Sequence, residues 1–279
     1  MSLLEQILPS AIIAMMVAAG ICGLALYWGK ERVRAAFGPV ALGLAYLSGH
    51  LVITGRVTFP PADTTNWLPY FALAGAVLGA WCALVTIKPW ARVLIFATVF
   101  TGALTLLLKP KFQYGWSLGE GCLWMAGLVS IFVLLAVILD ALGRRTATST
   151  EMPAFLLVTC AGTFGALMLS GSILLGQFAA VLGAAVLGSL VFTVGRVALG
   201  RGIVPVFSLL MGALLLCGYF FADLPLPCAI MLALAPAFAL IPIGKPGKLL
   251  AFAIRSALVS VPILVALVAA FRASPPLSE

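Results

Sequence analysis

The stretch IVPVFSLLMGALLLCGYFF, residues 203–221, contains no charged side chain. As a helix that rises about 1.5 Å per residue, it would cross most of the ~30 Å hydrocarbon core of a lipid bilayer. Similar apolar blocks recur along the whole chain, in which 63% of the residues are hydrophobic and only 9% are charged. An average globular domain carries about 25% charged residues, so this chain cannot cover a water-soluble surface. The composition predicts an all-α fold, a polytopic bundle of transmembrane helices.

Charged residues and turn residues divide the chain into about ten apolar spans of membrane-crossing length. The predicted spans are residues 7–28, 35–54, 68–87, 93–108, 122–142, 153–170, 174–194, 203–221, 227–243 and 249–271. Only the tetrapeptide SGSI (170–173) separates the sixth span from the seventh. We expect residues 1–272 to form a single integral membrane domain, followed by a disordered polar tail at 273–279.

The basic residues predict how the chain is threaded. The odd-numbered loops contain Lys30, Arg32, Arg34, Lys88, Arg92, Arg144, Arg145, Arg196, Arg201, Lys245 and Lys248. The even-numbered loops contain only Arg56, Lys109 and Lys111. Because basic loops stay in the cytoplasm, we expect both termini to lie outside, in the plasma or inner membrane of a cell. The same rule accounts for the net charge of +8 without a nucleic-acid partner.

The loop that contains Arg144 and Arg145 divides the predicted spans into five and five. The two halves would therefore insert with opposite orientation, as in the inverted-repeat transporters. No matching sequence repeat relates the halves, so the prediction of 5+5 inverted halves rests on the number of spans alone.

His50 is the only histidine of the chain and lies inside the second predicted span. Gly43, Tyr46, His50 and Thr54 are spaced to share one face of a helix. The simplest interpretation is a neutral imidazole that packs between helices, with a hydrogen bond to Tyr46. The alternatives are ligand binding or proton transfer. A metal or haem role is less favoured, since no second histidine completes the common sites. We expect no metal and no cofactor.

Other spans carry stripes of small and hydroxyl residues, which pack helices together in lipid. The third span contains Gly75-x-x-x-Gly79, and the second, fourth, sixth and seventh spans should form the inner bundle. If that bundle contains a cavity, we expect it to be lined by Tyr46, His50, Thr54, Thr101 and Gln177.

Two predicted outer loops, residues 55–67 and 109–121, are longer than the other loops. Their candidate functional residues are Arg56, Asp63 and Glu120. These loops either anchor the protein at the membrane interface through their aromatic residues or form a shared lid.

Carboxylates near the middle of a membrane span are the usual markers of ion-coupled transport. None of the eight acidic residues lies there. Asp140 comes closest, but Arg144 follows it by four residues, a spacing that predicts an ordinary ion pair at a helix end. The six cysteines form no Cys-x-x-Cys pair, so we expect small packing residues rather than disulfides or metal ligands.

The chain contains none of the common nucleotide-binding, hydrolase or metalloprotease motifs. Three functions then remain. The first is a small carrier or permease for an uncharged or weakly charged solute. The second is a non-catalytic membrane subunit or scaffold, which would have membrane-protein partners or form a homo-oligomer. The third is an intramembrane enzyme that acts on a lipid-linked substrate at the outer face and uses His50 with Asp63 or Glu120.

Overall fold

The computed structural model of the protein describes residues 3–25, 31–61, 63–145, 150–193, 202–243 and 247–273, and their regular structure is all helical. The elements are α1 (Leu3–Ala25), α2 (Glu31–Thr54), η1 (Thr64–Trp67), α3 (Leu68–Leu84), α4 (Pro89–Leu107), α5 (Lys109–Tyr114), α6 (Leu118–Arg145), α7 (Glu151–Leu169), α8 (Ile173–Thr193), α9 (Ile203–Phe221), α10 (Leu226–Leu234), η2 (Ala235–Leu240) and α11 (Lys248–Ala273). Within the described ranges, nine helices are long and apolar enough to cross a membrane. The predicted class, a polytopic helical bundle, is confirmed.

The ninth predicted span, residues 227–243, is not one of these nine helices, because its helix is short and broken. Leu226–Leu240 is α-helical as far as Leu234 and continues as the 3₁₀ helix η2. Pro236 lacks an N–H group and its ring clashes with the preceding helical turn, which ends the α-helix. Because a 3₁₀ helix rises about 2.0 Å per residue, the whole segment still extends about 25 Å. Arg145 at the end of α6 donates a hydrogen bond to the carbonyl oxygen of Leu240 (3.2 Å), so the segment reaches the far end of the bundle.

Glycines end two of the helices. Gly55 follows α2 with φ 73°, and Gly171 follows α7 with φ 84°, values that favour glycine. At Gly171 the chain forms a Schellman turn, in which the N–H of Ser172 donates to the oxygen of Leu167 (3.2 Å). The division of the chain at residues 170–173 is therefore confirmed.

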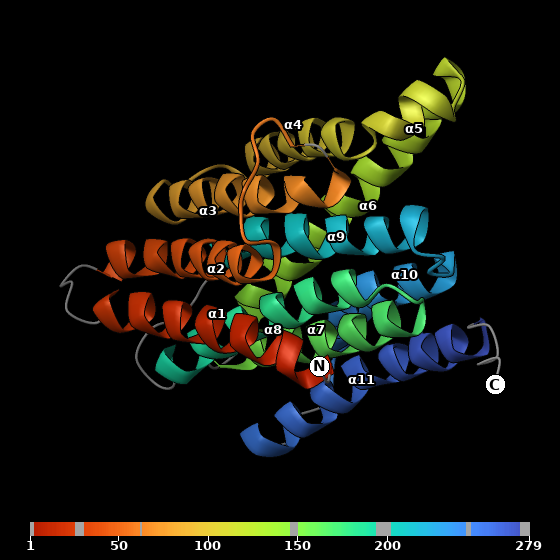
Figure 1. Ribbon diagram of the computed structural model, residues 1–279. Helices are drawn as coiled ribbons and strands as arrows, with labels where there is room; N and C mark the ends of the chain where they lie inside the picture. Colours follow the sequence, from red (N-terminus) through yellow and green to blue (C-terminus); the bar gives the residue numbers. More distant parts are fainter. Residues whose placement is uncertain are drawn as a thin grey trace.

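The helix ends alternate between the two sides of the bundle as predicted. Gly79 near the end of α3 lies against Pro39 of α2 and Gly202 at the start of α9. At the opposite end, Gln177 of α8 donates a hydrogen bond to Gln6 of α1 (3.3 Å). In Figure 1 the end of α1 and the start of α2 lie at the left, and the α9–α10 connection lies at the right.

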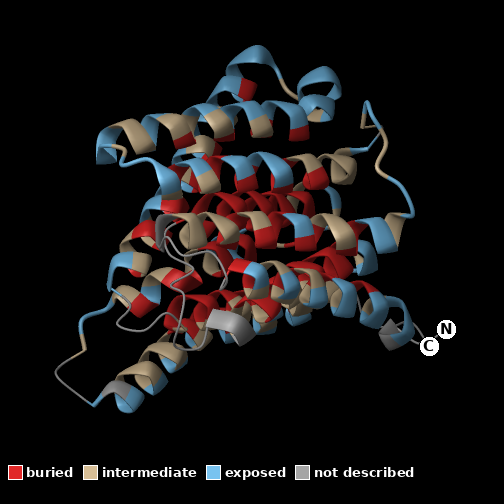
Figure 2. Cartoon of the chain, turned by 90° about the vertical axis from the view of Figure 1, so that its left-hand side faces the viewer, coloured by how far each residue is buried: buried red, intermediate tan, exposed pale blue. Residues whose placement is uncertain are grey.

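The helix α9 lies at the centre of the bundle. In the most apolar 18-residue stretch of α9, 89% of the residues are buried, compared with 22% in the corresponding stretches of α1, α4 and α11. Figure 2 shows the buried residues gathered in the middle of the molecule and the exposed ones around it. The inner bundle was predicted to include the fourth span, α4, and this prediction is wrong. The α4 hydroxyls of Thr98 and Thr101 donate to carbonyl oxygens of their own helix (3.0 and 2.8 Å), so this face needs no polar neighbour.

The two predicted halves share one core, because α1 and α2 pack against α8 and α3 packs against α9. An inverted relation between the halves stays a prediction. The helix α11 ends at Ala273, the first residue of the predicted tail, and residues 274–279 lie outside the described residues. So do several predicted loop cations: Lys30, Arg196, Arg201 and Lys245.

Candidate functional site

His50 belongs to α2, and its side chain is buried against α8. Its residue is 1% exposed, and its ring stacks on Phe178 with 4.5 Å between the ring centroids. The imidazole Nδ1 has no hydrogen-bond partner, and neither does the hydroxyl of Tyr46 one turn earlier. The expected hydrogen bond between Tyr46 and His50 is therefore not formed. Packing, rather than polar chemistry, holds the imidazole in place.

Glycines let other helices approach α2 closely beside His50. A Cβ atom at Gly49 would lie 3.1 Å from the carbonyl oxygen of Ser10 in α1 and would collide with Val181 in α8. A Cβ atom at Gly43 would lie 2.8 Å from the carbonyl oxygen of Ala72 in α3. Small residues at helix interfaces permit such close contacts.

The other predicted cavity residues do not converge on His50. Gln177 is 7% exposed and is bonded to Gln6, as described above. The hydroxyl of Thr54 donates to the carbonyl oxygen of His50 in its own helix (2.9 Å). Thr101 lies on the exposed face of α4. The structure thus brings Tyr46, His50 and Gln177 to buried positions on α2 and α8, and leaves Thr101 outside.

The outer-loop candidates lie apart from the imidazole. Arg56 and Asp63 are exposed, and Asp63 precedes η1 without capping it through its side chain. The Glu120 carboxylate accepts hydrogen bonds from the backbone N–H and the hydroxyl of Ser117 (3.0 and 2.9 Å) and caps the start of α6. Among the described residues, no hydrogen bond or ion pair joins His50 to either acid, and nothing in these contacts resembles an acid–base pair.

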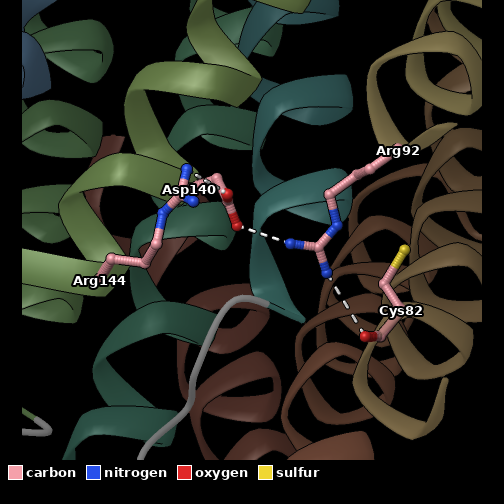
Figure 3. A network of polar contacts seen from close by, with 4 residues as sticks. All are labelled: Cys82, Arg92, Asp140 and Arg144. Carbon is pink, nitrogen blue, oxygen red and sulfur yellow. Dashed lines mark hydrogen bonds and ion pairs between the residues drawn. The ribbon is translucent and has the colours of Figure 1, made fainter. Parts of the chain in front are cut away.

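The strongest polar network lies at the opposite end of the bundle, around Asp140 (Figure 3). Its carboxylate accepts from Arg144 (2.9 Å), as the sequence predicts, and also from Arg92 at the start of α4 (2.7 Å). Arg92 reaches the carbonyl oxygen of Cys82 in α3 as well (3.4 Å). The network ties α3, α4 and α6 together, and the part played by Arg92 was not foreseen.

A second ion pair was missed altogether. Arg255 of α11 donates to the carboxylate of Glu151, the first residue of α7 (3.1 Å). The Glu151 side chain is 5% exposed and that of Arg255 is 22% exposed. The sequence signal for this ion pair was Arg255, a basic residue that lies two turns inside an apolar span. These two ion pairs and the Arg145–Leu240 bond join helices at the end predicted to be cytoplasmic.

An apolar groove lies between α6, α9 and α10. It extends from Trp124 and Tyr219 near the outer ends of α6 and α9 to Leu135 and Ala233 near the middle of the bundle. At about 1.5 Å per residue, the α6 side of the groove is roughly 16 Å long. The groove encloses about 50 Å³ of free space, and no charged side chain lines it.

The rim of the groove faces outward. Ile131, Leu226 and Ile230 are each 40% exposed. The only lining side chains with a polar atom are those of Trp124 and Tyr219, both at the outer end. The groove therefore presents an elongated apolar surface to the bilayer. No sequence pattern marks this groove, since its lining residues resemble those that face lipid.

The fold and these sites define a multi-pass helical membrane protein. The chain matches no known family model, no curated protein and no solved structure. Among the described residues, no three His, Cys, Asp or Glu side chains gather in a way that could hold a metal ion.

We expect the polar character of His50 to contribute nothing to stability. Replacing His50 by leucine keeps most of the side-chain volume and removes the unpaired Nδ1 atom, so the free energy of unfolding should stay unchanged or rise by about 1 kcal/mol. Replacing it by alanine leaves a cavity and should cost about 2–3 kcal/mol. Thermal unfolding in detergent compares the two variants. Equal destabilisation by both would indicate that the imidazole has a polar partner, and the packing interpretation would be wrong.

Proposed function

We propose that the protein is a carrier in the plasma or inner membrane, and that its solute is uncharged or weakly charged with an elongated apolar part. The observation that supports this proposal is the groove that extends to the middle of the bundle beside a broken helix. Discontinuous helices near the bilayer midplane commonly form the solute sites of transporters.

The groove matches this solute class in its chemistry. A charged solute would lose its hydration there without a compensating partner, which is costly in an apolar environment. An apolar chain suffers no such penalty.

Passage to the cytoplasmic side requires α6 and η2 to separate. At that end the guanidinium of Arg145 bonds the last carbonyl of η2, and this single hydrogen bond is exposed. Exposed polar contacts contribute little to stability. The contact between α6 and η2 is therefore the part of the bundle that we expect to open during transport.

Vesicles that contain the purified protein test the carrier function. Fluorescently labelled diacylglycerol, phosphatidylcholine and phosphatidylglycerol serve as probes, and dithionite reports how fast each one crosses the bilayer. We expect at least one probe to cross faster than in protein-free vesicles. Ala233, 8% exposed on the groove wall, should slow this crossing about tenfold when it is replaced by phenylalanine.

The control is Val261→Phe, which places the same phenylalanine side chain on the exposed face of α11, where Val261 is 54% exposed. This variant should transport normally. If no probe crosses faster than in protein-free vesicles, the carrier proposal is wrong.

A second candidate, a non-catalytic subunit of a membrane complex, is favoured by the outer face of α4. Thr98, Thr101, Gly102 and Thr105 are exposed there, and nothing lies within 4 Å of a Cβ atom placed on Gly102. Small and hydroxyl residues are typical of contacts between membrane helices. Under this alternative, Ala233→Phe changes no transport rate.

A further inference from the structure

We propose that the groove and Lys111 together bind an anionic phospholipid, with one acyl chain in the groove and the phosphate against the Lys111 ammonium group. This inference rests on the proposed role of the groove and names a lipid with a single negative charge, whose apolar acyl chain lies in the groove while the charged phosphate stays outside it. It concerns binding, which is measured without transport.

The cation is held at a defined place. Lys111 belongs to the short helix α5, and its Nζ atom lies 5.6 Å from the ring centroid of Phe220 and 5.9 Å from that of Phe221. Aromatic ring faces attract a cation but leave its charge uncompensated. Among the described residues Lys111 forms no ion pair. Glu120 is bonded to Ser117, and Asp223, which follows Phe221 by two positions, is exposed and forms no ion pair with Lys111. The ammonium group is therefore available to an external anion.

The same rings connect the cation to the groove. Phe220 contacts Trp124 edge to face, with 5.7 Å between the ring centroids. Trp124 lies 6.2 Å from Tyr219, and both side chains line the outer end of the groove. A single aromatic ring thus separates Lys111 from the groove entrance.

The position and length of the site fit one leaflet of a bilayer. Tryptophan and tyrosine favour the level of the lipid headgroups, which places Trp124, Tyr219 and their neighbour Lys111 near the phosphates. The groove then extends roughly 16 Å inward, about half of the ~30 Å hydrocarbon core. One acyl chain occupies this length, and the positive charge at the entrance selects a negative headgroup.

Quenching of Trp124 fluorescence by brominated lipids tests the site. The protein retains Trp124 as its only tryptophan and is placed in phosphatidylcholine nanodiscs that contain increasing fractions of brominated phosphatidylglycerol or brominated phosphatidylcholine. We expect half-maximal quenching at about a fivefold lower fraction of phosphatidylglycerol, since one basic residue near the surface attracts an anionic lipid by roughly this factor. If this variant does not fold, the difference between wild type and Trp124→Phe gives the same quantity.

The variants separate the site from general surface charge. Lys111→Gln should abolish the preference for phosphatidylglycerol, whereas Lys109→Gln removes an equal charge from an exposed position of the same helix and should keep it. Ala229→Phe fills the groove and should weaken quenching by both lipids. Equal quenching by the two lipids in the wild-type protein, or equal effects of the two lysine variants, would overturn the proposal. A preference for phosphatidylglycerol without faster lipid crossing would support the lipid-binding site and contradict only the carrier function.

Discussion

Replacing Gly79 by alanine is expected to lower the free energy of unfolding by about 3 kcal/mol, the upper part of the usual range for overpacked sites. The added Cβ atom would collide with the carbonyl oxygen of Gly202 and lie 2.6 Å from the Cβ of Pro39. One turn earlier, a Cβ atom on Gly75 would lie 2.7 Å from the Cα of Val206. Because the neighbours of both glycines include backbone atoms of α9, the two helices must move apart to admit the methyl group.

Gly102→Ala is the matched control. It makes the same change inside α4, at a position where nothing lies within 4 Å of the new Cβ atom. Alanine is the better helix former, so this variant should be neutral or more stable by up to about 1 kcal/mol. Thermal unfolding measured with a thiol-reactive dye compares the two variants, in a Cys122→Ser background because Cys122 is exposed and the other cysteines are buried. If Gly79→Ala and Gly102→Ala unfold at the same temperature, α3 and α9 are not packed backbone to backbone.

Replacing Asp140 by alanine is expected to cost about 3 kcal/mol, because it leaves a poorly solvated guanidinium without its carboxylate. The Arg92 side chain is 12% exposed, and Asp140 is its carboxylate partner (Figure 3). Water cannot fully replace that partner at such low exposure. The same dye measurement reports the loss.

Arg144→Ala provides the comparison, since it removes the other partner of Asp140. The Arg144 side chain is 48% exposed, so solvent screens this contact and its removal should cost less than about 1 kcal/mol. Replacing Arg92 by methionine and Asp140 by leucine together removes both charges and should restore most of the stability. An Asp140→Ala variant as stable as Arg144→Ala would show that the Arg92 contact contributes nothing.

Residues close together in the sequence carried most of the correct predictions. The ion pair between Asp140 and Arg144 follows from helical spacing alone. The Gly75-x-x-x-Gly79 motif predicted a close contact between helices, but it did not predict that the partner helix is α9. The interpretation of His50 as a packed residue agrees with its burial, but its expected bond to Tyr46 is absent.

Residues far apart in the sequence account for what was missed. Arg92 meets Asp140 from a different helix, and Arg255 meets Glu151 across more than a hundred positions. Thr101 is predicted to line the inner bundle because hydroxyls often bond neighbouring helices, yet its hydroxyl bonds its own helix.

Hydropathy and charge act along the chain, so they were enough to predict the helical membrane class and the apolar segments that form its long helices. The central place of α9, the peripheral place of α4 and the groove beside the broken helix α10 became clear from the packing of the helices. The cause of this difference is the solvent. Lipid is as apolar as the protein interior, so an apolar side chain alone does not tell whether its helix faces the bilayer, the core or a ligand.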